Sequence, residues 1–327
     1  MNVKPIKHLI KAVLAWPPLW RLVTARRWRN QVIVLMYHLV EPDSDHATEL
    51  TISQFRQQLD WLQRTCRIIK PAEFAGLAGR KRLRGRPQVL LTFDDAFVSV
   101  RDRVYPELKA RGLQGLVFVP SEPVNEGGSI WPQWHRDLFL YGQYESLPSF
   151  ETRDSRVTPG NEQERRDAEQ QVRKRLKTMS NRQREDALAA LARAANWDNA
   201  QLHPESRIMS WDDLRACADV FTYGGHTHTH PIMASISIDA QRLEVQTCAE
   251  YLQRELGVAP FFFAYPNGEQ GDYNDASLAA LQEAGYRFAF TTREGLYHTG
   301  DNPLTIRRLP TWAPTAADLA WIIATAD

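Results

Sequence analysis

Two groups of polar side chains in the sequence have the residue types needed for hydrolytic chemistry. The first group is Asp94 and Asp95, which directly follow a run of mostly apolar residues, 88–93. Two adjacent carboxylates repel each other, and a metal ion that takes one together with a proton-transfer role for the other would relieve this repulsion. The structural alternative is a turn or a helix cap, positions that aspartate also suits.

The second group is a run of histidines much further along the chain. His226, His228 and His230 alternate with threonines after a pair of glycines. Alternate residues share a face in an extended segment, whereas His226 and His230 can also converge across a turn of helix. Such a run can be a solvated surface feature, but imidazole combined with the upstream carboxylates is a common ligand set for zinc. Metal binding is therefore the favoured hypothesis.

The elements that must position these groups alternate between strands and helices. Alternation of this kind predicts a parallel sheet or barrel with the catalytic groups at the carboxyl ends of the strands. The run at 88–93 is too short for a typical helix and shows no alternation, which suits a strand that is covered on both faces. Further strands are expected at 32–37, 67–69, 114–120 and 220–223. Helices are expected after Ser53, which is predicted to cap the first of them, at about 98–111 and at 210–218.

Residues 121–205 interrupt this alternation. A helix is expected within 130–138, and two helices rich in charged residues within 161–197, the second with a capping box formed by Ser180 and Gln183. The region is interpreted as an insertion rather than an independent domain. Acidic residues lie among its basic ones, so its charged blocks are expected to be solvated faces, and a nucleic-acid partner is not expected.

Composition narrows the class of protein. The chain has 327 residues, of which 43% are hydrophobic and 24% are charged, enough to bury one large core. Its 3 cysteines are far apart and include no CxxC pair, so neither a disulfide framework nor a zinc ribbon is supported. The sequence has no G-x-S-x-G motif, P-loop or G-x-G-x-x-G motif, so a serine hydrolase and a nucleotide-binding protein are disfavoured.

The first 30 residues differ chemically from the rest of the chain. They contain seven basic residues and no acidic ones, whereas the remainder carries 33 basic and 39 acidic residues. Apolar side chains fall on one helical face, and tryptophans lie among the arginines. This pattern predicts an interfacial helix on an anionic membrane, with a helix packed on the domain as the alternative. A cytoplasmic, membrane-associated location is expected, with export through a cleaved signal peptide as the less favoured alternative.

Several motifs resemble those of the polysaccharide deacetylases of the NodB-homology type, carbohydrate esterase family four. Thr92-Phe-Asp-Asp95 resembles the first family motif, and His226-Thr-His-Thr-His230 the second, which has the form H-[ST]-x-x-H. Tyr265-Pro-Asn-Gly268 is similar to the third, of general form R-x-P-x-G. Met36-Tyr-His38 and Ser210-Trp-Asp212 are further family features, and the resemblance covers roughly residues 31–310.

The resemblance implies a fold and a site. The fold is a distorted barrel of about seven β/α units, formed by residues 31–327 with the helical insertion at about 121–205. The implied metal ligands are Asp95, His226 and His230, and the implied general base is Asp94. A backbone N–H near Asn267 would stabilise the oxyanion. The metal is expected to be Zn²⁺, with Co²⁺, Ni²⁺ or Mn²⁺ as alternatives.

Aromatic side chains are expected to line a sugar groove, although each of them equally suits a core. The substrate-binding residues predicted from the sequence are Tyr37, Trp211, Tyr265 and Pro266, with Trp131, Trp134 and Trp312 as additional aromatic candidates.

Two departures from the family pattern concern its proton-transfer groups. Ala264 stands where the third motif has an arginine that orients the catalytic aspartate, and Arg307 or Arg308 is a candidate substitute. The motif that carries the family's general-acid histidine is absent, which leaves His228 and His298 as candidates.

The implied activity is metal-dependent removal of the N-acetyl group from a glycan that contains N-acetylhexosamine, in the biosynthesis of a surface polysaccharide, exopolysaccharide or glycolipid. Two alternatives remain open. One is a carbohydrate-binding protein that keeps the metal site but is catalytically weakened, and the other is a deacylase or deformylase of another amino sugar.

Overall fold

Seven parallel strands close into a barrel in the computed structural model, which describes residues 11–13, 15–24, 30–44, 47, 49–80, 83, 85–152, 154–158 and 160–327, without the side chains of 21–24. The order around the ring is β1, β13, β11, β10, β9, β6 and β5, and β5 pairs with β1 to close it. The predicted barrel of about seven units is thus confirmed. The ring strands are β1 (Gln31–Tyr37), β5 (Gln88–Phe93), β6 (Gly115–Val119), β9 (Phe221–Gly225), β10 (Phe262–Ala264), β11 (Phe288–Glu294) and β13 (Ile306–Pro310).

Shorter strands accompany the ring. β4 pairs in parallel with the start of β5, and β12 pairs antiparallel with the start of β1. Two small ribbons lie outside the barrel, β2 with β3 and β7 with β8. These short strands are β2 (Val40–Glu41), β3 (Leu50–Thr51), β4 (Arg67–Ile68), β7 (Leu147–Pro148), β8 (Arg156–Val157) and β12 (Tyr297–His298).

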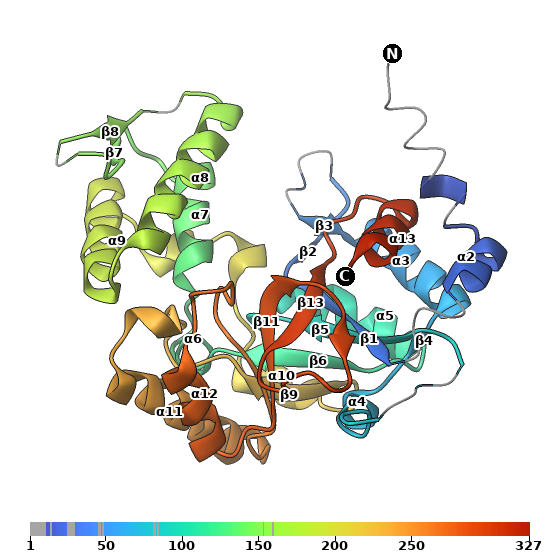
Figure 1. The fold of residues 1–327 in the computed structure, drawn as a ribbon. Coiled ribbons are helices and arrows are strands. Elements are labelled where there is room, and N and C mark those ends of the chain that lie inside the picture. The colour runs from blue at the N-terminus through green and yellow to red at the C-terminus, as the bar shows by residue number, and fades with distance from the viewer. Residues whose placement is uncertain are drawn as a thin grey trace.

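Helices surround the barrel and connect its strands (Figure 1). They are α2 (Pro17–Thr24), α3 (Ile52–Thr65), α4 (Pro71–Ala75), α5 (Tyr105–Ala110), α6 (Ser121–Glu126), α7 (Trp131–Tyr141), α8 (Glu162–Thr178), α9 (Asn181–Ala195), α10 (Trp211–Ala216), α11 (Ile238–Leu256), α12 (Asp275–Glu283) and α13 (Ala316–Thr325), with shorter turns η1 (Val100–Val104), η2 (Asn199–Gln201), η3 (Pro204–Ser206) and η4 (Met233–Ser235).

Both faces of the ring strands are buried, which explains why β5 reads as a continuous apolar run. Val89, Leu91 and Phe93 belong to the core between barrel and helices, whereas Leu90 belongs to a separate cluster with residues from the other strands. That second cluster fills the barrel interior. Side chains alternate between the two faces of a strand, so every second residue from Leu90 faces the barrel interior. Asp94, just beyond the end of the strand, is one of these residues.

The expected start of the first long helix is corrected by the structure. Thr51, not Ser53, caps α3, because its hydroxyl accepts a hydrogen bond from the Gln54 N–H and the Gln54 side chain bonds back to the Thr51 N–H. This is a capping box of the T-x-x-Q form. Ser53 instead donates its hydroxyl to Asp43. The helix expected at 98–111 begins as the π-helical turn η1 and continues as α5.

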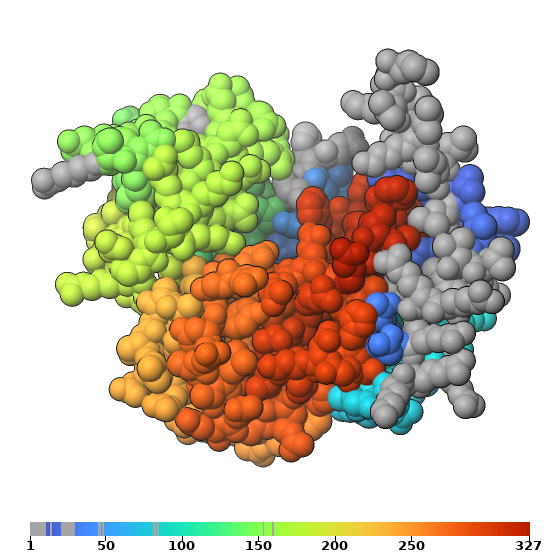
Figure 2. Space-filling view, viewed as in Figure 1, coloured from blue at the N-terminus to red at the C-terminus, as the bar shows by residue number. Residues whose placement is uncertain are grey.

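Helices α7, α8 and α9 form a lobe beside the barrel (Figure 1). The lobe has its own apolar core, which includes Leu138, Val172 and Leu191. Buried Arg184 donates to the Ser235 hydroxyl, a contact of 3.2 Å that joins α9 to the loop before α11. In the space-filling view the lobe rests on the amber and orange part of the chain (Figure 2). The predicted division at residue 30 and at about 121 and 205 stays a prediction.

The described part of the N-terminal segment packs on helices α3 and α13 through Trp20, Ala15 and Lys11, although Trp16 in the same segment is exposed. Trp20 on α2 is fully buried, and its ring lies 4.9 Å from that of Trp61 on α3. The Trp61 indole N–H donates to the Ala15 carbonyl, and Lys11 pairs with Asp318. The alternative of a helix packed on the domain thus describes these residues, and the membrane contact is not supported.

The rest of the basic segment, residues 1–10, 14 and 25–29, lies outside the described residues. None of the helices in the described part of the chain combines the length and apolar character needed to span a bilayer. The expected cytoplasmic location stays a prediction.

Candidate active site

A cavity of about 380 Å³ lies between the carboxyl ends of the barrel strands and the helical lobe. One wall comes from residues at or just beyond strand ends, and the other comes from α7 and α8. The barrel wall includes His38, Asp94, Asp95, His226, His230, Asn267, Thr292 and Thr311, and the lobe contributes Gln133, Arg136, Glu169, Arg173 and Lys177. The cavity therefore occupies the place where active sites of α/β barrels form.

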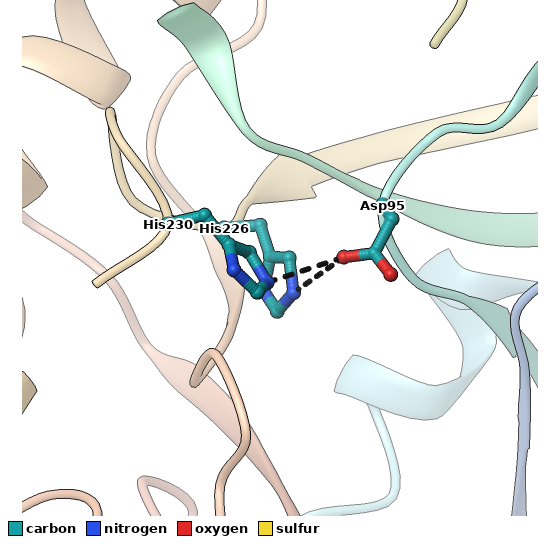
Figure 3. A group of neighbouring side chains, drawn as sticks. All are labelled: Asp95, His226 and His230. Carbon is teal, nitrogen blue, oxygen red and sulfur yellow. Dashed lines mark ion pairs between the residues drawn. The ribbon is translucent and has the colours of Figure 1, made fainter. Parts of the chain in front are cut away.

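Three buried side chains converge in this cavity (Figure 3). The Asp95 Oδ1 atom lies 3.2 Å from His226 Nε2 and 3.3 Å from His230 Nε2. One ligand-type atom from each of the three residues lies within 4.8 Å of the others. The structure thus brings together the three residues that the motifs predicted as metal ligands.

The hydrogen bonds of these side chains fit a bound cation. His226 Nδ1 lies 2.7 Å from the Ala264 carbonyl oxygen, which can only accept, so Nδ1 carries the proton. In the neutral ring the Nε2 lone pair then faces the Asp95 carboxylate, and two electron-rich atoms 3.2 Å apart need a positive charge. A proton or a divalent metal would supply that charge. The carbonyl that fixes the ring is the usual outer partner of a metal-binding histidine.

The pKa shifts show how strongly these groups depend on one another. Burial opposes ionisation of Asp95, but hydrogen bonds from both histidines outweigh it, and the pKa of Asp95 is lowered. Burial also opposes protonation of the two rings. The Asp95 contact reverses this for His226, whose pKa is raised, whereas burial prevails for His230, whose pKa is lowered. The site accommodates one positive charge more readily than two protonated rings.

The second carboxylate of the pair has a different partner. Arg308, fully buried in the barrel, binds Asp94 through two contacts of 2.7 Å, one to each carboxylate oxygen. Its remaining donors contact the Thr291 carbonyl and the Thr92 hydroxyl. Burial raises the pKa of Asp94, but the Arg308 charge and hydrogen bonds outweigh this and lower it overall. Of the two arginines that could replace the missing third-motif arginine, Arg308 makes the contact.

The backbone at the site adopts sparsely populated conformations. Asp95, Thr227, His230 and Asn267 all have positive φ angles, of 69°, 64°, 60° and 61°. Non-glycine residues in this region cost free energy and persist only where surrounding contacts fix them. The Thr227 hydroxyl supplies one such contact, because it accepts a hydrogen bond from the His230 N–H at 3.1 Å.

His38 is a cavity-lining histidine for which the sequence motifs indicated no role. It follows β1 as Asp94 follows β5, it lines the cavity, and its Nε2 lies 3.7 Å from Asp94 Oδ2. The two histidines proposed as general acids do not line the cavity: His228 contacts the Ser121 hydroxyl and stacks on Tyr251, and His298 contacts Gln31. The position of His38 directly after a barrel strand was the sequence signal that could have identified it.

The structure does not bring the predicted aromatic substrate-binding residues to the cavity. Tyr37 donates its hydroxyl to Gln58, Tyr265 donates to the Leu304 carbonyl, and both side chains are buried. Trp131, Trp211 and Pro266 are buried away from the cavity wall, and Trp134 is half-buried against the core of the lobe. Trp312 is exposed to solvent and lines the cavity. For the buried rings, the packing alternative describes what the structure shows.

Asn267 is the predicted catalytic residue of the third motif, and it does line the cavity. Its side-chain nitrogen is buried and has no hydrogen-bond partner. A buried amide without a partner is costly, so this donor is available for a group that enters the cavity.

Comparisons with known proteins agree with this architecture. A sequence model described as polysaccharide deacetylase matches residues 162–289, a stretch that contains the histidine run and the Tyr265–Gly268 motif but not Asp94 and Asp95. The relationship to polysaccharide deacetylases that the motifs predicted is thereby confirmed. Among curated protein sequences, none matches this chain.

Solved structures similar to this chain share its fold. They include the Streptococcus pyogenes deacetylase PplD in complex with acetate, at 18% identity and a TM-score of 0.60, with 90% of this chain and 99% of that chain covered. IcaB from Ammonifex degensii matches at 22% identity and 0.56, with 90% and 97% covered. The BpsB deacetylase domain from Bordetella bronchiseptica matches at 15% and 0.53, with 86% and 96% covered. At these identities the likeness concerns the fold alone.

Proposed function

We propose that the chain is a divalent-metal-dependent hydrolase that removes the N-acetyl group from a glycan containing N-acetylhexosamine. The observation that carries this proposal is the arrangement in one cavity of the Asp95, His226 and His230 cluster beside the Asp94–Arg308 pair. The polysaccharide deacetylase match supports the class of substrate. Synthesis of a surface polysaccharide or glycolipid is the proposed setting.

The chain's own residues supply the proton transfers that amide hydrolysis requires. The reaction breaks the C–N bond with one water and yields acetate and a free amine. Asp94, kept ionised by Arg308, accepts a proton from the attacking water. His38 stands on the cavity wall where it can donate a proton to the departing nitrogen. The unpartnered Asn267 amide can donate to the acyl oxygen as negative charge develops there.

Zn²⁺ is the proposed metal, with Co²⁺, Ni²⁺ or Mn²⁺ as alternatives. When held by Asp95, His226 and His230, such a cation would activate water and polarise the acyl oxygen as a Lewis acid.

The alternative of a catalytically weakened carbohydrate-binding protein is less well supported. A binding protein has no need of a buried base, yet Asp94 retains an arginine that binds both of its oxygens. Removal of a formyl or another acyl group from an amino sugar would use the same catalytic residues. This alternative differs from the proposal in its substrate and not in its reaction.

Acetate release tests the proposal. Metal-stripped protein, reloaded with Zn²⁺ or Co²⁺, is incubated with partially acetylated chito-oligomers and a panel of related acylated amino-sugar glycans, and products are identified by mass spectrometry. We expect deacylation that requires added metal and is lost in Asp94→Asn. Metal binding without any deacylation across the panel would favour the weakened binding protein, and the absence of metal binding would refute the proposed site.

A further inference from the structure

The loop that carries His226 and His230 is fastened from outside the cavity by one carboxylate. Glu244, on α11, accepts hydrogen bonds from the backbone N–H groups of His228 and Thr229, each at 2.8 Å, and from the Thr229 hydroxyl at 2.7 Å. Charge-assisted hydrogen bonds of this length are stronger than neutral ones. One side chain thus satisfies three donors in the segment between the two histidines.

The opposite side of the same loop is held by α6. The Thr227 and His228 carbonyls accept hydrogen bonds from the N–H groups of Ser121 and Glu122, at 3.2 Å and 2.9 Å. The loop is therefore clamped between two helices, with its N–H groups directed to α11 and its carbonyls to α6. Glu244 is the side chain that accepts from the loop backbone, whereas α6 contacts the loop through two backbone N–H groups and through the Ser121 hydroxyl, which lies 2.8 Å from His228 Nδ1.

The loop needs this support because its conformation is strained. Thr227 and His230 both have positive φ angles, which non-glycine residues rarely adopt. These two residues turn the chain so that the Nε2 atoms of His226 and His230 point at the same oxygen of Asp95. If the N–H groups of His228 and Thr229 lost their acceptor, the turn would relax and the two rings would no longer be held at a common distance from Asp95.

We propose that Glu244 is a positioning residue for the metal site: it holds the His226–His230 loop so that both imidazoles are preorganised for one divalent cation. Glu244 does not line the cavity and touches no reacting group. The inference rests on the proposed function, because it assumes that Asp95, His226 and His230 bind a metal.

Zinc affinity tests this inference without any substrate. Wild-type protein, Glu244→Ala and Glu244→Gln compete with a chromophoric chelator for Zn²⁺. Groups that hydrogen-bond a metal ligand directly contribute about 10–100-fold in affinity. Glu244 acts through the backbone between the two ligands, so we expect a loss at the lower end of this range, about 10-fold, in Glu244→Ala. Glu244→Gln should keep most of the wild-type affinity, because its amide oxygen still accepts from both N–H groups, although without the assistance of charge. Glu250→Ala, an exposed glutamate on the same helix, is the matched control.

A second measurement separates positioning from a general loss of structure. Backbone amide exchange in the metal-free protein should accelerate at His228 and Thr229 in Glu244→Ala, while the amides of the barrel strands remain protected. If Glu244→Ala does not fold, Glu244→Asp, which keeps the charge but withdraws the acceptor, takes its place and should lose affinity relative to Glu244→Gln.

The outcomes distinguish the inference from the proposed function. Wild-type protein that binds no zinc would refute the proposed metal site, and the inference with it. Wild-type zinc binding with an equal affinity in Glu244→Ala would overturn the inference alone. A loss in Glu244→Gln as large as in Glu244→Ala would also overturn it, because charge rather than the hydrogen bonds would then be responsible.

Discussion

The buried Asp94–Arg308 pair makes a quantitative prediction about stability. Arg308 is fully buried and Asp94 is 2% exposed, and they share two contacts of 2.7 Å. Removing one partner of a buried pair leaves an uncompensated charge and typically costs about 3–5 kcal/mol. We therefore expect Arg308→Met and Asp94→Asn each to lower the free energy of unfolding by about this amount.

The double variant should be less destabilised than the sum of the two single variants, because neither charge then remains unpaired. We expect an interaction energy on the order of 2–3 kcal/mol, at the upper end for residues in direct contact. This interaction energy is measured by urea unfolding of the wild type, the two single variants and the double variant. Unfolding is followed by tryptophan fluorescence and circular dichroism without added metal. The exposed pair Arg242 and Glu283 provides a control cycle that should be nearly additive.

The pH dependence of the same cycle supplies an internal check. In the wild type the pKa of Asp94 is lowered, so its contribution to stability is present above its unfolded pKa and is lost as the pH falls. Without Arg308, burial alone should raise that pKa, so the cost of Arg308→Met should be greater at pH 7 than at pH 4. Additivity within about 0.5 kcal/mol at pH 7 would refute the argument that the pair acts as a unit.

Three further predictions follow from the site and from the N-terminal helix. Asp94→Asn should keep the metal and lose turnover by about two to four orders of magnitude, whereas Asp95→Asn should lose metal affinity; equal metal loss by elemental analysis would contradict this division of roles. His38→Gln should lower kcat by about 10²–10⁴-fold at unchanged zinc affinity, and an unchanged kcat would exclude it as the proton donor. Trp20→Ala should destabilise the fold by about 3–5 kcal/mol, whereas Trp16→Ala, at a side chain 61% exposed, should have little effect; equal effects in thermal unfolding would contradict the packing of α2.

Four of the seven barrel strands, β1, β5, β6 and β9, could be predicted from the sequence because their burial leaves a direct signature. Strand β5 coincides with the apolar run at residues 88–93, since both of its faces are covered. The convergence of Asp95 with His226 and His230 was also predictable, because parallel strands bring their carboxyl ends to one end of a barrel.

Features that depend on how the strands pair could not be predicted from the sequence. The choice between Arg307 and Arg308 depends on which residue of β13 faces the barrel interior, and that parity is set by its pairing with β11 and β1. The role of His38 depends on its distance from Asp94, which closure of the ring determines. The surface that Trp20 contacts could not be predicted for a different reason. An amphipathic helix has the same sequence pattern whether its apolar face meets a lipid surface or another helix.

The closure of the ring between β1 and β13 links the competence of the site to the order in which the chain is made. In vectorial synthesis β1 and β5 emerge early, but Thr311, which follows β13 and bonds the Met36 carbonyl, lies 275 residues beyond Met36, and Arg308 lies 214 residues beyond Asp94. Contacts between such distant segments form late, because their loops are costly to close. A nascent chain thus carries the Asp94 carboxylate without its counter-charge until β13 is in place. A stalled or misregistered β13 would leave an open barrel in which Asp94 lacks Arg308, so closure of the ring and completion of this ion pair coincide.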